Sequence, residues 1–332
     1  MGKKQTEGAE ASESKGEQDI LAKVPKDTPK EITKPKKKMS LIPDSLRNAK
    51  EVSKSINEPR KKENSGVTKD KTITITFGDC AENHVGMQQI GTLAEVGFSV
   101  EDLRAIEKDL KERFPKAEIE LHDLNTYLPP KTKGEPASIL VVRKGVDILL
   151  SEAGKTADDL KKEQDTLTPD TQFFDRRRKK VLNKHARYNL CFAEDPQQAD
   201  FEQGKGTVVA WSSVKLLKYI RENLHNFLGD KGKNLEGEGN YYYDPSTCGI
   251  GFHGDTERRK VVGIRLGETI PLHYQWYDHH SPIGERGKFS FDHGDFYVMS
   301  EKASGFDWKR SIKPTLRHAA GAKKYLTINK KK

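Results

Sequence analysis

Two residues in the second half of the chain have the types and the spacing of metal ligands. His253 and Asp255 are separated only by Gly254. In a β-strand, residues two positions apart point to the same side, so both side chains can face one point. A histidine and a carboxylate on one face supply two of the three ligands of a 2-His-1-carboxylate iron site, which leaves three coordination positions open. A surface hydrogen bond between the two side chains is the alternative.

The residues around this pair extend the pattern over roughly positions 172–330. They comprise Asn240-Tyr241-Tyr242-Tyr243-Asp244, Ile250-Gly251-Phe252-His253-Gly254-Asp255-Thr256-Glu257-Arg258, Arg265-Leu266-Gly267, Gly294-Asp295-Phe296-Tyr297-Val298-Met299-Ser300 and Asp307-Trp308. In this order they resemble the motifs of the AlkB-like family of 2-oxoglutarate oxygenases. The stretch 183–189 loosely resembles the family's substrate-lid region.

The resemblance implies a role for each matching residue. Iron(II) would be bound by His253 and Asp255. The cofactor 2-oxoglutarate would receive hydrogen bonds from Asn240 and Tyr242, although tyrosines that simply alternate between core and surface would give the same pattern.

Three further residues are implied to lie near the substrate. Glu257 and Arg258 would lie beside the iron, near the substrate or supporting the ligands. Arg187 belongs to the lid-like stretch and is a candidate substrate contact.

The third iron ligand and the partner of the far 2-oxoglutarate carboxylate are harder to place. His318 is the only histidine after Asp295, so it is the predicted third ligand. A gapless match to the family from Gly294 instead places Lys309 at that position, and a protonated lysine is a poor ligand. The stretch 315–317 resembles the family's Thr-Phe-Arg ending, which would make Arg317 the carboxylate clamp.

Arg317 and His318 are adjacent, so on a regular strand they cannot both point inward. If His318 binds iron, the clamp must come from later in the chain, and Lys324 is the best candidate because 324–328 resembles the family's last strand. If Arg317 is the clamp, the iron site is incomplete. We favour His318 with Lys324 and keep the other arrangement open.

The implied reaction is an oxidation that consumes O2 and converts 2-oxoglutarate to succinate while a C–H bond is hydroxylated. Hydroxylation of an N-methyl group would lead to demethylation. A nucleic-acid base (DNA or RNA) is the expected substrate, because the chain has a formal charge of +9 and a basic run at 176–180 beside the lid-like stretch. The alternatives are an enzyme that hydroxylates or demethylates protein side chains and a catalytically silent nucleic-acid-binding module.

The surrounding sequence predicts an α+β protein in three parts. Residues 1–70 are lysine-rich with five prolines and predict a disordered basic tail. Residues 71–168 predict a small α+β domain, with strands at 72–77, 118–121, 139–142 and 145–150 and helices beginning after Ser99 and at Thr156. Residues 169–332 predict a double-stranded β-helix, or jelly roll, from short strands at 208–211, 261–266, 270–276 and 296–299 and one helix at 213–228.

Composition places the chain in a broad class. Its hydrophobic content is 33%, and its three cysteines, Cys80, Cys191 and Cys248, are too far apart for a disulfide framework or a Cys-x-x-Cys metal site. A reducing interior, cytoplasmic or nuclear, fits this usage best. No apolar segment long enough for a signal sequence or a membrane span occurs, so we expect no membrane association.

Overall fold

A computed structural model of the chain describes residues 71–328. The tail predicted for residues 1–70 lies outside the described residues. The strands are β1 (Thr72–Gly78), β2 (Cys80–Glu82), β3 (Gln89–Gly91), β4 (Ile119–Asp123), β5 (Ser138–Val142), β6 (Gln172–Asp175), β7 (Lys180–Asn183), β8 (Tyr188–Ala193), β9 (Val208–Ala210), β10 (Glu236–Tyr242), β11 (Gly249–His253), β12 (Val261–Gly267), β13 (Leu272–Asp278), β14 (Ser281–Phe289), β15 (Phe296–Met299) and β16 (Thr315–Gly321).

Helices are fewer and connect the strands. They are α2 (Val100–Arg113), α3 (Gly145–Leu149), α4 (Ala157–Asp165), α5 (Lys215–Asn223), α6 (His225–Leu228), α7 (Glu301–Ser304) and α8 (Lys323–Leu326). Within residues 71–328, none of them is long and apolar enough to cross a membrane.

Two main sheets organise the fold, and they are almost entirely antiparallel. The larger has eight strands in the order β4-β5-β15-β12-β1-β10-β8-β9, and the smaller has four in the order β11-β16-β13-β14. Among the strands of residues 71–328, only the pair β8–β9 is parallel. The fold class is therefore α+β with a large β-rich region, as predicted, and two hairpins, β2–β3 and β6–β7, complete it.

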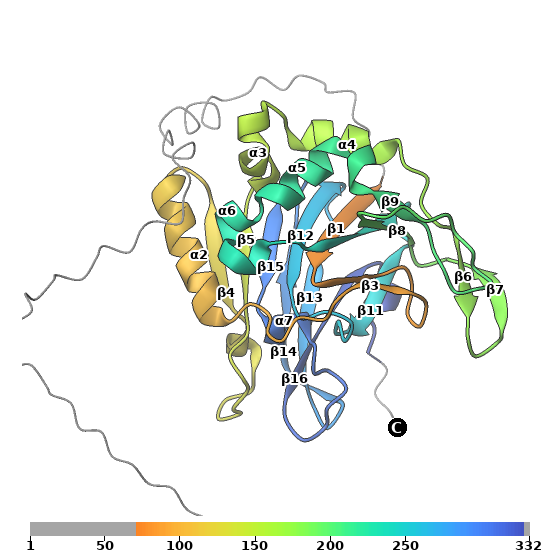
Figure 1. Cartoon of the computed structure of the whole chain (residues 1–332). Helices are drawn as coiled ribbons and strands as arrows, with labels where there is room; N and C mark the ends of the chain where they lie inside the picture. The colour runs from red at the N-terminus through yellow and green to blue at the C-terminus, as the bar shows by residue number, and fades with distance from the viewer. Residues whose placement is uncertain (1–70, 329–332) are drawn as a thin grey trace, which may run out of the picture. The chain divides into compact units, whose positions relative to one another are not determined.

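The two faces of the larger sheet have different partners. Apolar side chains of β1, β10 and β12 pack with those of α2, α4 and α5 in one core cluster, and Figure 1 places the helices α3, α4, α5 and α6 together along one side of this sheet. The opposite face packs on the smaller sheet through a second cluster that includes Val261, Tyr297, Tyr274 and Leu316. The sheets thus face each other as the two layers of a β-sandwich.

The alternating sequence of β1 follows from this position. Ile73, Ile75 and Phe77 are fully buried on the helix side of the sheet. Thr74 and Thr76 point to the other side and line a cavity between the sheets. Because successive strand residues face opposite sides, one short sequence serves both the core and the cavity.

Most of the predicted elements are confirmed. The strands expected at 72–77, 118–121, 139–142, 208–211, 261–266, 270–276 and 296–299 match β1, β4, β5, β9, β12, β13 and β15 within one or two residues, and the helix at Thr156 is α4. Helix α2 begins after Ser99, whose hydroxyl accepts from the backbone N–H of Asp102 in a capping box. The predicted helix at 213–228 is divided into α5 and α6 by Leu224.

Three predictions about the organisation are wrong. Residues 145–149 form the helix α3 where a strand was expected at 145–150, and 323–326 form α8 where a last strand was expected. The segment 71–168 is not a domain of its own, because β1 pairs with β10 and β12, and β5 pairs with β15. A single sheet and a single core cluster therefore join residues before and after position 168.

Candidate metal centre

The predicted metal ligands come together on the smaller sheet. Strands β11 and β16 pair with His253 directly opposite His318, and Asp255 follows two residues after the end of β11. One ligand atom from each of the three residues lies within 4.8 Å of the other two. The Nε2 atoms of His253 and His318 lie 3.5 and 3.7 Å from the same carboxylate oxygen of Asp255. With metal–ligand bonds of about 2.1 Å, ligands at right angles are about 3 Å apart, so a small contraction would fit the three atoms around one ion.

Hydrogen bonding and burial leave the right atoms available to a metal. His253 Nδ1 lies 2.8 Å from the carbonyl oxygen of Gly251, so the N–H belongs on Nδ1 and the lone pair on Nε2. His318 is 6% exposed. Its burial, reinforced by His253 and Arg258, holds its pKa well below the usual value of 6.5, so the ring is neutral at pH 7. Neutral imidazole is the form that binds metals.

Lys309, the alternative third ligand, contacts Thr256 and Trp308. Its ammonium lies 5.8 Å from the ring centroid of Trp308 and 3.5 Å from the hydroxyl of Thr256. It lines the cavity.

The three ligands open into a large cavity between the sheets. Its volume is about 1290 Å³, and its walls include Asn240, Tyr242 and the metal group. Typical ligand sites have about 300–1,000 Å³. The cavity therefore has room for a small co-substrate together with part of a larger molecule.

Charged and polar residues next to the metal group form one connected network. Arg187 donates to the side-chain oxygen of Asn240 (2.6 Å), and Asn240 donates to Glu238 (2.9 Å). Glu238 forms an ion pair with Arg258, which also contacts Glu257 at 3.0 Å. Both members of the Glu238–Arg258 pair are nearly fully buried, so removing either partner would leave an uncompensated charge. The three residues predicted near the substrate, Arg187, Glu257 and Arg258, thus all lie at the cavity.

Neither predicted carboxylate clamp reaches the cavity. Arg317 lies on the other side of β16 from His318, with its guanidinium 3.8 Å from the ring centroid of Tyr277 and 4.9 Å from that of Trp308. Lys324 is exposed on α8, 5.1 Å from the ring of Tyr325. Successive residues of β16 face opposite sides, so Arg317 points away from the cavity when His318 points into it, as the sequence predicts. The prediction that Lys324 takes the place of Arg317 as the clamp is not borne out.

Sequence reasoning missed one cationic residue of the cavity wall, Arg265 on β12. Its side chain faces the cavity and is 1% exposed. The sequence does mark Arg265 as unusual, because Arg265 is the only charged residue in the otherwise apolar strand Val261–Gly267. The family motif that the stretch 265–267 resembles has no charge at this position.

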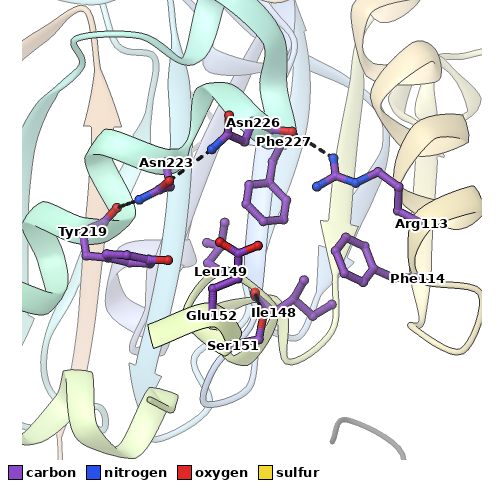
Figure 2. A pocket seen from close by; sticks show the side chains of 10 residues that line it. All are labelled: Arg113, Phe114, Ile148, Leu149, Ser151, Glu152, Tyr219, Asn223, Asn226 and Phe227. Atoms are coloured by element: carbon purple, nitrogen blue, oxygen red, sulfur yellow. Dashed lines mark hydrogen bonds between the residues drawn. The ribbon is translucent and has the colours of Figure 1, made fainter. Parts of the chain in front are cut away.

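A second, smaller hollow lies away from the metal group. Figure 2 shows it between residues of α2, α3, α5 and α6, with Phe114 and Phe227 among its walls and Arg113 donating to the backbone carbonyl of Asn226. Its volume is about 20 Å³, room for about one water molecule. It shares no lining residue with the large cavity, which remains the candidate site.

Comparison with known proteins identifies a viral relative. An uncharacterized protein of Acanthamoeba polyphaga mimivirus is 46% identical over 261 residues, which are 77% of this chain and 98% of the viral protein. The chain belongs to the family of that viral protein. No family model matches the sequence.

Proposed function

We propose that the chain is an Fe(II)- and 2-oxoglutarate-dependent dioxygenase, related to the AlkB-like enzymes, that hydroxylates or demethylates nucleic-acid bases. The observation that carries this proposal is the group His253, Asp255 and His318, which offers two imidazoles and one carboxylate to one point of a large cavity. This donor set with open positions is typical of non-haem iron oxygenases. Iron and 2-oxoglutarate, when bound, would supply the oxidising chemistry.

The strand order supports the jelly-roll form of this proposal. From β10 to β16 the chain alternates between the sheets except at the hairpin β13–β14: β10, β12 and β15 belong to the larger, and β11, β13, β14 and β16 to the smaller. Chain segments that alternate in this way around a common axis are expected of a double-stranded β-helix. Strand β1, from the N-terminal side, lies between β10 and β12.

The chain's own residues would bind and orient the reactants. His253, Asp255 and His318 would hold the metal on one side, which leaves the cavity side open to ligands. Asn240 and Tyr242 line the same cavity and would hydrogen-bond 2-oxoglutarate. The buried Glu238–Arg258 pair fixes the segment that follows Asp255 and so holds the carboxylate near the two imidazoles.

The wall contributed by hairpin β6–β7 supports a nucleic-acid substrate. Phe173 contacts the ring of His84 with their centroids 3.9 Å apart, and Arg178, Lys184 and Arg187 line the cavity nearby. Figure 1 shows this hairpin extending from the body of the fold. Aromatic surfaces and cations at one opening suit a flat base and its phosphates.

Metal binding tests the first half of the proposal. Iron(II) titrated anaerobically into the full chain should bind with a stoichiometry of one, and calorimetry should give at least a tenfold loss of affinity for His253→Ala, Asp255→Ala and His318→Ala. His273→Ala is the matched control, because His273 is also buried but belongs to neither the ligand group nor the cavity lining. Wild-type iron affinity in His318→Ala would mean that another residue is the third metal ligand. Wild-type iron affinity in His253→Ala would refute the metal centre.

Turnover tests the second half. Succinate release should be stimulated by a methylated DNA or RNA oligonucleotide and not by methylated peptides. Stimulation by peptides alone would favour the protein-directed oxygenase. Iron binding without succinate release on any of these substrates would contradict the proposed activity.

A further inference from the structure

Three polar side chains line up across the centre of the larger sheet. Thr74 on β1 lies in register with Asn240 on β10 and with Arg265 on β12. All three side chains line the cavity. The fold therefore places a hydroxyl, an amide and a guanidinium side by side on one wall.

Two members of this row have unused donors. The Nε and Nη1 atoms of Arg265 and the hydroxyl of Thr74 are buried without a hydrogen-bond partner. Among residues 71–328, no carboxylate forms a salt bridge with Arg265, whose guanidinium lies 5.7 Å from the ring centroid of Phe291. A buried charge without a partner is unfavourable, so such a group in a cavity wall suggests a missing ligand.

Arg258 provides an internal comparison. It lines the same cavity and is 4% exposed, against 1% for Arg265. The protein gives Arg258 two carboxylates, those of Glu238 and Glu257. The fold thus neutralises Arg258 with its own carboxylates. It leaves the charge of Arg265 to be neutralised by a ligand that enters the cavity.

The position of Tyr297 relates Arg265 to the metal group. Tyr297, on β15, lies opposite Gly263, two residues before Arg265, and its ring packs over that glycine. Burial raises the pKa of its hydroxyl, and Arg265 and Asp255 are both close enough to act on it, the first lowering and the second raising the pKa. The metal group, Tyr297 and Arg265 all line the same cavity, so an anion bound at the metal group can extend through it toward Arg265.

We propose that Arg265, assisted by the hydroxyl of Thr74, binds a carboxylate of a small acidic ligand and is the clamp for the distal carboxylate of 2-oxoglutarate. A guanidinium can donate two parallel hydrogen bonds to a carboxylate, and the threonine adds a third donor from the neighbouring strand. The anion site follows from the unpaired donors alone, whereas its assignment to 2-oxoglutarate rests on the proposed function.

Ligand binding separates these two statements. Affinities of the full chain for 2-oxoglutarate and for 2-oxobutyrate, which lacks the distal carboxylate, are measured anaerobically by calorimetry with iron(II) present. Arg265→Gln should weaken 2-oxoglutarate binding by a factor of about 100 or more and change 2-oxobutyrate binding little. Thr74→Val should weaken 2-oxoglutarate binding about fivefold to tenfold.

Matched variants test whether the other two cationic residues bind the distal carboxylate. Arg317→Gln and Lys324→Gln remove the two clamps predicted from sequence and should leave 2-oxoglutarate affinity within about twofold. Iron(II) affinity should be unchanged in all four variants, which distinguishes loss of the anion site from loss of the metal centre. If wild type binds 2-oxoglutarate through Arg265 but binds no iron, the anion site stands and the proposed function fails.

Stability without ligand is an independent readout. Arg265→Met removes an unpaired buried charge and should raise the urea midpoint of the ligand-free chain. Arg258→Met leaves the buried carboxylate of Glu238 without its cation and should lower the urea midpoint. Wild-type 2-oxoglutarate affinity in Arg265→Gln, or a 100-fold loss in Arg317→Gln, would overturn the assignment. An equal loss for 2-oxobutyrate would also overturn it, because the distal carboxylate would then not be the group that Arg265 binds.

Discussion

Gly254, between two of the metal ligands, gives a sharp test of how the centre is held. A Cβ at this position would lie 2.1 Å from the carbonyl oxygen of Gly305 and 2.7 Å from Cδ1 of Trp308. The opposing backbone has little freedom, because Gly305 ends helix α7 with φ of +73°. The N–H of Asp255 also donates to the carbonyl of Ser304 across the same contact.

Gly254→Ala should therefore separate these two segments. Overpacking of this kind costs about 1–3 kcal/mol of folding free energy. The strain falls on the contact that places Asp255, whose carboxylate oxygen lies only 3.5 Å from Nε2 of His253. We expect iron(II) affinity to fall about tenfold, which corresponds to about 1.4 kcal/mol.

Gly251→Ala is the matched control on the other side of His253. A Cβ there would have its nearest contact at 3.6 Å, the carbonyl oxygen of Tyr325, which is ordinary van der Waals contact. The carbonyl that Gly251 offers to His253 Nδ1 is kept in alanine. We expect a change in stability of less than about 0.5 kcal/mol and wild-type iron affinity.

Urea unfolding with and without iron(II), under anaerobic conditions, measures both effects. The reasoning is refuted if Gly254→Ala unfolds at the wild-type urea concentration and binds iron with wild-type affinity. It is also refuted if the two alanine variants lose stability equally, because the close approach to Gly305 would then not be the cause.

Two further predictions concern pH and domain boundaries. Burial raises the pKa of Glu82 from 4.5 to about 7, so between these pH values the folded chain keeps a proton that the unfolded chain releases, and stability falls as pH rises. Glu82→Gln should remove this part of the pH dependence, and parallel wild-type and variant curves of urea midpoint against pH would contradict it. A fragment of residues 169–332 should fail to fold, because β10 and β12 would lose β1 between them; a cooperative unfolding transition for that fragment would show that the break at residue 168 is real.

The metal group could be predicted because its signal is local. The two-residue spacing of His253 and Asp255 fixes their common direction in any strand. His318 followed from the absence of another histidine after Asp295. Helix α2 was equally local, since Ser99 and Asp102 form its cap without help from the rest of the chain.

The wrong predictions concern features that depend on distant partners. The run 145–150 is short and apolar, and such a run fits a strand or a buried helix equally well until its neighbours are known. Its first turn is positioned by residues 294 and 295, through the carbonyl of Gly294 and the carboxylate of Asp295. Arg265 is visible as a charge in an apolar strand, but its lack of a partner appears only when the neighbouring strands β1 and β15 are placed beside it.

The central place of β1 has a consequence for how the protein is made. Thr72 pairs with Tyr242 and with Gly267, which are 170 and 195 positions later in the chain (242 − 72 and 267 − 72). At about 5–20 residues per second, a ribosome needs roughly 10–40 s to make the intervening polypeptide. During that time the nascent segment 72–78, rich in threonine and isoleucine, has neither of its partner strands, and such segments are prone to intermolecular pairing. The high contact order that follows predicts slow folding, with closure of the main sheet delayed until β12 has left the ribosome.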